Sequence, residues 1–234
     1  MKRLVLAAFV LLGACINSDP DNDFPVVPQG GGTGGGGTSA PAIRGRVCLV
    51  TDPRFLATCA TTGAAGLSVS IGNSSATTIA NGTFVMPQPT AGITSMVSVT
   101  GSGIVPSTTP LNAAAQIPVI NQALFDMMVL QTGIITTHGS GSILASITRG
   151  GEPVPNITAV ATPTPAFGPF FDGTTPTGFT VNPTGTQGVV FFSGAATTAP
   201  VNVTFTDPLS QTETTVGGVQ VIDGGITFVE ANLP

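Results

Sequence analysis

After residue 41 the chain breaks into short runs of Val, Ile, Thr and Phe, separated by Gly, Pro and Asn. In residues 67–71 (LSVSI) and 201–205 (VNVTF) every second residue is apolar, which is the period of a strand with one buried face. Closely spaced strands of this kind, with turn residues between them, are typical of antiparallel β-sandwiches. We therefore predict a mainly β protein.

The runs form two groups, and each group is long enough for its own sandwich. We expect domains at residues 42–116 and 139–234, joined by a linker at 117–138. The strands are predicted at residues 43–50, 66–71, 82–86 and 95–100 in the first group, and at 142–148, 157–162, 188–192, 201–206, 213–221 and 226–231 in the second.

The segment between the groups has a different pattern. Residues 117–131 (IPVINQALFDMMVLQ) contain no Gly and carry Leu, Met and Phe in place of Thr. We predict a helix over residues 120–131, with Asn121 capping its start and Gly133 ending it. The apolar face of this helix, expected to pack, holds Ile120, Leu124, Met127 and Met128.

The N-terminus is typical of a secreted protein. Residues 1–15 (MKRLVLAAFVLLGAC) place two positive charges before an apolar run that is too short to span a membrane. The ending LGAC resembles a bacterial lipobox, which implies that residues 1–14 are removed and that Cys15 carries the lipid. The alternative is an ordinary signal peptide with an incidental Cys. Because Ile16 rather than Asp follows Cys15, the lipobox implies the outer membrane.

Residues 15–41 contain no foldable pattern. The stretch is acidic and interrupted by Pro, and it ends in the Gly-rich run GGGTGGGGTSAP. Such a sequence is typical of a flexible linker, and we predict a disordered tether.

Short motifs in both groups resemble carboxypeptidase regulatory-like, or prealbumin-like, β-sandwich domains. In the first group these are residues 43–47 (IRGRV), 63–69 (GAAGLSV) and 81–84 (NGTF), and in the second 141–143 (GSI), 151–157 (GEPVPNI) and 185–191 (GTQGVVF). The resemblance implies seven-stranded prealbumin or Ig-like modules with an accessory, adhesive or structural role and no catalytic residues. Related adhesin domains form a Lys–Asn crosslink, which cannot form here because Lys2 is the only lysine and lies in the signal peptide.

Charge excludes several functions. The chain has six Lys and Arg against eleven Asp and Glu. Without a basic patch it has no electrostatic footprint for nucleic acid. Without a lysine in the mature chain, Walker-type phosphate loops and Schiff-base chemistry are also excluded.

Two cysteines are the first and last residues of a twelve-residue insertion, CLVTDPRFLATC. In an oxidising envelope Cys48 and Cys59 are most simply a disulfide, because redox sites use a closer spacing and zinc would need two more ligands. His138 is the only histidine and lies in a Gly/Ser-rich segment, where we interpret it as a solvated loop residue. A Ser–His–Asp set assembled in space remains the alternative.

An unusual aromatic segment, residues 165–173 (PAFGPFFDG), carries Phe167, Phe170 and Phe171. Placed between Pro and Gly, it is predicted to form neither a regular strand nor a helix. Either the rings fold under the sandwich, which we favour, or they present an apolar patch to a partner.

Together these features predict a lipid-anchored, non-enzymatic envelope protein with a structural or binding role. Its partners would be the membrane, through the anchor, and an envelope protein or polysaccharide; no cofactor or metal is predicted. The alternatives are an envelope hydrolase using His138 and a subunit of a surface assembly docking through residues 167–171.

Overall fold

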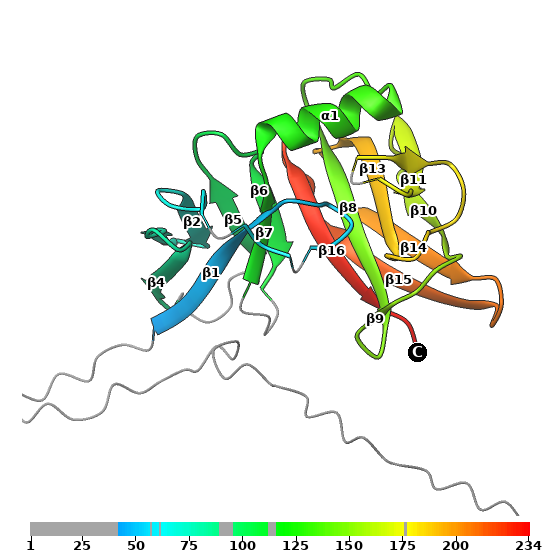
Figure 1. Cartoon of the computed structure of the whole chain (residues 1–234), viewed down its shortest axis with the longest axis horizontal. Helices are drawn as coiled ribbons and strands as arrows, with labels where there is room; N and C mark the ends of the chain where they lie inside the picture. The colour runs from blue at the N-terminus through cyan, green and yellow to red at the C-terminus, as the bar shows by residue number, and fades with distance from the viewer. Residues whose placement is uncertain (1–41, 57, 61, 89–95, 112–115, 176) are drawn as a thin grey trace, which may run out of the picture.

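The protein is mainly β, as the sequence predicts, with one α-helix among the described residues (Figure 1). This computed structural model describes residues 42–234 apart from 57, 61, 89–95, 112–115 and 176. The predicted signal peptide at 1–14, the lipidated Cys15 and the tether at 15–41 lie outside the described residues.

The first unit holds seven strands in two sheets. One sheet has the order β4-β1-β7, in which β1 pairs antiparallel with β4 and parallel with β7. The other runs β6-β5-β2-β3. Seven strands are what the resemblance implies, but unrelated sandwiches share that number. The strands are β1 (Ala42–Val50), β2 (Ser68–Ile71), β3 (Ser74–Thr77), β4 (Thr83–Pro87), β5 (Met96–Thr100), β6 (Ser107–Pro110) and β7 (Gln116–Ile120).

Alternation along these strands builds the first-unit core between the two sheets. In β5, Val97 and Val99 point inward while Ser98 lies on the other face. The facing sheet contributes Val47, Phe84 and Val119. The hydrophobic effect, about 25 cal/mol for each Å² of apolar surface removed from water, thus holds the two layers together.

The second unit is also a sandwich. A sheet of order β12-β11-β13-β8-β16 faces a three-stranded sheet of order β10-β14-β15. Its core is the second-unit core, which includes Ile143, Phe192, Val203, Phe205 and Val229. The strands are β8 (Ser140–Arg149), β9 (Glu152–Pro153), which pairs only with β8, β10 (Thr158–Thr162), β11 (Phe167–Asp172), β12 (Phe179–Thr180), β13 (Val189–Ala196), β14 (Val201–Asp207), β15 (Thr212–Val219) and β16 (Ile226–Asn232).

One sheet runs through both units. The C-terminal strand β16 lies between β8 and β6 and pairs in parallel with both, so the larger sheets of the two units form a single ten-stranded sheet. Residues 117–120, expected in a linker, form most of β7 inside the first unit. The units are therefore joined by backbone hydrogen bonds and not by the helical segment alone.

Helix α1 (Gln122–Thr132) forms where the sequence predicts it. The Asn121 side chain accepts a hydrogen bond from the Leu124 N–H at 2.7 Å, which caps the first turn. Gly133 ends the helix with a left-handed φ of 67°, a conformation that glycine adopts without steric cost. Leu124, Phe125 and Met128 are buried, whereas Met127, expected on the apolar face, is 48% exposed.

The helix closes a third core, called the shared core because both units contribute to it. In Figure 1 α1 lies across the upper end of the molecule. Its buried side chains form one cluster with β1 residues from the first unit and with Leu144, Phe191 and Phe228 from the second. The Phe125 ring meets Phe191 edge-on, with ring centroids 6.4 Å apart.

The first-unit core and the shared core lie on the same face of the long sheet. Paired residues of adjacent strands point to one side of a sheet. Val99 of the first-unit core pairs with Ser107, which pairs with Ile226 of the shared core. Val229, displaced by an odd number of residues along β16, belongs to the second-unit core on the opposite face. The long sheet is thus covered by β4-β1-β7 and α1 on one side and by β10-β14-β15 on the other.

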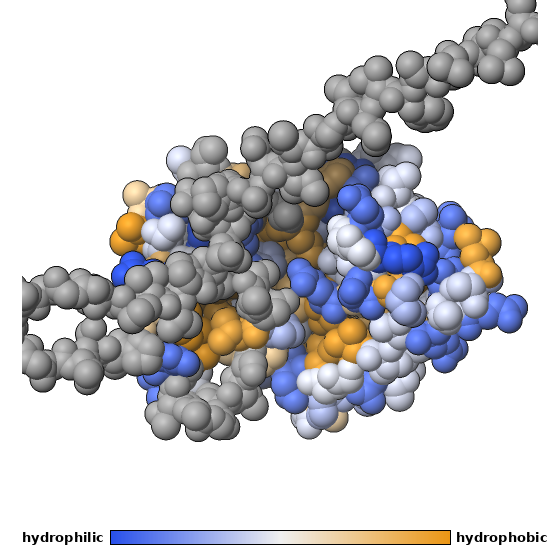
Figure 2. All heavy atoms as spheres, turned by 90° about the horizontal axis from the view of Figure 1, so that it is seen from below, coloured by the Kyte–Doolittle hydropathy of each residue, from blue (hydrophilic) through white to orange (hydrophobic). Residues whose placement is uncertain are grey.

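The opposite end of the molecule is seen in Figure 2, from below. Hydrophobic side chains are visible in the middle of the described part, with more hydrophilic side chains toward the right flank. β1 starts at this lower end with Ala42 and finishes near α1.

Candidate functional site

A small polar cavity lies beneath one side of α1. It has a volume of about 170 Å³, more than ten times the ~10–15 Å³ that one water requires. The helix, the segment leading into β8, strand β13 and the turn before β16 all contribute to it. The lining residues are Gln122, Phe125, Asp126, Val129, Thr136, Thr137, Ser140, Gly141, Ser142, Ser193, Gly224 and Gly225.

The cavity exists because small polar residues replace large apolar ones at the end of the helix-covered face. On β8, Ser142 and Leu144 point to this face, and on β13 Ser193 and Phe191 do so. Where Leu144 and Phe191 fill the space under the helix, the two serines leave it open. A bulge in β13 follows Ser193 directly, and bulges are frequent beside binding sites.

Ser142 and Ser193 form a buried hydroxyl pair in the cavity lining. Each is 2% exposed, and their Oγ atoms are 3.0 Å apart. Two hydroxyls carry two protons, and one proton is consumed in the bond between them. No other side-chain hydrogen bond among the described residues involves either hydroxyl, so this pair retains one donor.

Other polar groups of the cavity are partly committed. Ser140 donates to the Thr137 carbonyl at 2.6 Å, so Thr137 Oγ1 donates to Ser140 Oγ at 2.9 Å. Gln122 Nε2 donates to Asp126 Oδ1 at 2.8 Å, which holds the carboxylate at the helix surface. Asp126 is the only charged side chain among the described lining residues, and the cavity therefore has a negative edge.

His138 flanks this cavity and is not part of its lining. Its Nδ1 lies 3.0 Å from Asp223 Oδ2, and the Asp223 Oδ1 accepts the Gly139 N–H at 2.8 Å. The imidazole is 97% exposed, in agreement with the predicted solvated loop position. Among the described residues, Asp223 is the ion-pair partner of His138, and no serine side chain forms a hydrogen bond with either of them.

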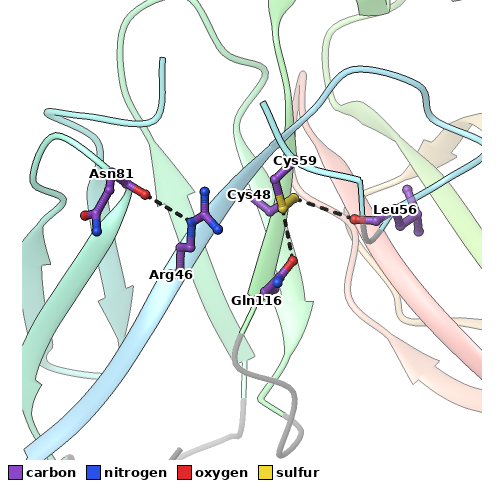
Figure 3. The surroundings of a disulfide bond; sticks show 6 residues. All are labelled: Arg46, Cys48, Leu56, Cys59, Asn81 and Gln116. Atoms are coloured by element: carbon purple, nitrogen blue, oxygen red, sulfur yellow. Dashed lines mark hydrogen bonds between the residues drawn. A yellow bond between two sulfur atoms is a disulfide. The ribbon is translucent and has the colours of Figure 1, made fainter. Parts of the chain in front are cut away.

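The disulfide between Cys48 and Cys59 forms, with a Cα–Cα distance of 5.0 Å. Leu56 O and Gln116 Oε1 approach its sulfurs (Figure 3). A disulfide sulfur has no proton to donate, so both approaches are contacts without a hydrogen bond. Cys48 belongs to the shared core and Cys59 packs against it, and the bond therefore stabilises the region where the two units meet.

The loop closed by this disulfide also reaches the second unit. Arg54 donates to the Gly173 carbonyl at 3.1 Å and forms a 2.7 Å ion pair with Asp52. Burial opposes ionisation of Asp52, but the hydrogen bonds from Arg54 outweigh it and lower the pKa of this carboxyl.

The aromatic segment forms strand β11, and the expectation that it could form no regular strand was wrong. One extra residue bulges between Phe167 and Phe170 opposite β13, which accommodates Gly168 and Pro169. Gly168 has a φ of 101°, and a Cβ there would lie 2.8 Å from the Phe191 carbonyl oxygen.

The bulge changes the direction of the three rings. Phe167 and Phe170 are three positions apart, a spacing that puts side chains of a regular strand on opposite faces. Both nevertheless pack against the shared core. Phe171 is 3% exposed and lies in the second-unit core. The rings fill both faces of the long sheet, and only Phe167 and Phe170 keep a half-exposed surface.

Sequence reasoning missed the cavity. Ser142 lies within a predicted strand and Ser193 directly follows one, where a hydroxyl ordinarily faces water. The available signal was their position beside Leu144 and Phe191 on the same strand face, which requires knowing how β8 pairs with β13.

Within residues 42–234, apart from the undescribed gaps, no three His, Cys, Asp or Glu side chains are grouped to hold a metal ion. The same described part contains no helix of the length and hydrophobicity needed to cross a membrane. Comparison with protein-family models, curated proteins and solved structures finds no match to the chain. The resemblance to carboxypeptidase regulatory-like domains stays a prediction.

Proposed function

We propose that this protein is a lipid-anchored component of a bacterial cell envelope, in the outer membrane, whose folded part binds an envelope ligand. The observation that carries the proposal is the arrangement along β1. This strand starts at Ala42, directly after the predicted tether, and its far end enters the shared core under α1. The cavity and the helix therefore lie away from the point where the tether joins the fold (Figure 1).

The Cys48–Cys59 disulfide supports the proposed compartment. Structural disulfides form and persist in oxidising environments such as the bacterial periplasm and cell surface. The predicted signal peptide leads to the same environment.

Anchoring is tested by replacing the predicted lipidated residue, Cys15→Ser. The native protein should partition with detergent-extracted membranes, because several acyl chains bind a bilayer firmly. The Cys15→Ser protein should be found in the soluble envelope fraction or the medium. Ser18→Ala, in the same segment, is the matched control and should stay with the membrane, and membrane retention of the Cys15→Ser protein would contradict the anchor.

Binding is tested with the folded part added to purified envelope material. The protein beginning at residue 42 should co-sediment with that material and be displaced by excess unlabelled protein. Failure to co-sediment would contradict the binding role without affecting the anchor. Alkylation without reductant should leave Cys48 and Cys59 unmodified, which checks that the material tested is oxidised.

A hydrolase remains the second candidate because of one observation, the 3.0 Å approach of His138 and Asp223. A carboxylate that orients an imidazole is two-thirds of a nucleophilic triad. Loss of a measured hydrolase activity in a folded His138→Ala protein would support this candidate over the binding role. Docking of an assembly partner on Phe167 and Phe170 stays a further proposal.

A further inference from the structure

We infer that the cavity beneath α1 binds a single neutral sugar ring of an envelope glycan. This deepens the proposed binding role and rests on it.

The cavity presents a donor and an acceptor at separate places. The buried Ser142–Ser193 pair retains one hydroxyl proton. Asp126 uses Oδ1 to accept from Gln122, and among the described residues no recorded hydrogen bond occupies Oδ2. A ligand that fills the space can therefore accept from the hydroxyl pair, which is buried and so rarely stays without a partner, and can donate to the exposed Asp126 carboxylate. A hydroxyl group does both, and a sugar ring carries several.

Charge selects among hydroxyl compounds. The lining residues that the structure describes include one carboxylate and no Lys or Arg, and Asp223, which pairs with His138, adds a second carboxylate nearby. Phosphorylated sugars and sugar acids would meet only negative charge on entering. A neutral sugar meets no such repulsion.

The wall formed by the helix fits the apolar side of a sugar. Phe125 and Val129 contribute carbon surface between the polar groups. A sugar ring has C–H groups on its faces and hydroxyls on its edge, so its chemistry matches this alternation. A lone metal ion would leave the apolar wall unused and would find a single lining carboxylate.

The size limits the ligand to about one ring. Ligand cavities for drug-sized molecules have volumes of ~300–1,000 Å³, and this cavity has about 170 Å³. A glycan would therefore insert one residue and leave the remainder outside. Weak, millimolar binding of a free monosaccharide is expected from so small a contact.

The test is ligand-observed NMR of the folded protein with glucose, galactose, mannose and N-acetylglucosamine, and with Ca²⁺ and glucose 6-phosphate for comparison. We expect at least one neutral sugar to bind and glucose 6-phosphate to bind at least tenfold more weakly. Asp126→Ala and Ser193→Ala should each weaken the sugar at least tenfold. Glu213→Gln is the matched control, because this exposed carboxylate lies on β15, outside the lining.

Each outcome decides the inference. Binding of Ca²⁺ alone, of the phosphate ester as tightly as the neutral sugar, or of no sugar at all would overturn it, as would sugar binding unaffected by both cavity variants. Thermal melts show whether the variants are folded. Asp126→Asn, which keeps the shape of the side chain at this exposed position, replaces Asp126→Ala if that variant is unfolded. If the protein co-sediments with envelope material but binds no sugar, the inference fails and the proposed function stands.

Discussion

In this protein, the face of the long sheet to which a side chain points decides which core or cavity it joins. The Phe residues of β11 are the clearest case, because the bulge at Gly168 sends two rings to the shared core and one to the second-unit core. The same dependence explains why the cavity could not be read from the sequence. Ser142 and Ser193 have ordinary strand neighbours, and only the pairing of β8 with β13 brings their hydroxyls together under a helix.

Phe171→Ala should destabilise the protein by about 3–5 kcal/mol, the usual cost of removing a buried Phe ring. Phe170→Ala, at a half-buried position on the same strand, should cost clearly less. Urea unfolding monitored by circular dichroism gives both values. Equal costs would contradict the difference in burial between the two rings.

Asp207 should make stability depend on pH in the acid range. The hydrogen bond from Arg149, followed by that from the Leu209 N–H, lowers the pKa of Asp207 to about 2. In an unfolded chain an Asp has a pKa of about 3.9, so between these values the unfolded chain binds more protons. The stabilisation is therefore complete above about pH 4 and is lost as the pH falls toward 2.

The measurement is the urea midpoint at several pH values from 5 to 2, for the native protein and for Asp207→Asn. The native protein should lose more stability over this range than the variant. Parallel pH curves for the two proteins would show that Asp207 does not contribute. Glu213→Gln, on the exposed face of β15, is the control for removing a carboxylate.

At the scale of helices and strands, prediction succeeded where an element carries its own signal. β14 alternates apolar and polar residues along its length, and α1 has Asn121 before it and Gly133 after it. β3 (SSAT) and β6 (STTP) show no alternation of apolar and polar residues, so their own sequences do not predict strands. They are strands because they pair with neighbouring strands, β3 with β2, and β6 with β5 and β16. Residues 117–120 are expected in the linker, with residue 120 at the start of the helix, because nothing in their sequence indicates the pairing of β7 with β1.

Asn121→Ala should destabilise the protein by about 1 kcal/mol, because the Leu124 N–H loses its acceptor. Asn121→Asp keeps an oxygen at the same place and should cost less. Chemical unfolding measures both. A loss confined to the helix would appear as faster amide exchange in α1 alone, whereas a coupled shared core would transmit it to β13.

At the scale of the whole molecule, two sandwiches share one sheet and one core. The sequence predicts two groups of strands, but it contains no sign that β16 returns to lie beside β6, because neither strand's pattern specifies a partner. The disulfide adds to the same region through Cys48. The two units should accordingly unfold together, so that the free energy of unfolding is a property of the whole molecule and not of each unit.

We expect a single cooperative transition on heating, with calorimetric and van't Hoff enthalpies that agree. Reduction of the disulfide should lower the midpoint of the whole transition, at a cost of about 3 kcal/mol for a loop of this length. Two separate transitions, or a loss on reduction limited to the first unit, would show that the sandwiches are independent domains.

The position of β16 in the sheet also bears on how the chain reaches its final state. A polypeptide is made from its N-terminus, so β6 exists long before the strand that completes it. Until β16 arrives, one side of β6 is an open sheet edge, the type of surface on which chains associate with one another. Pairings this distant in sequence also form slowly. A chain cut short before Ile226 would keep that edge permanently, and loss of residues 226–234 should cause aggregation out of proportion to the contacts removed.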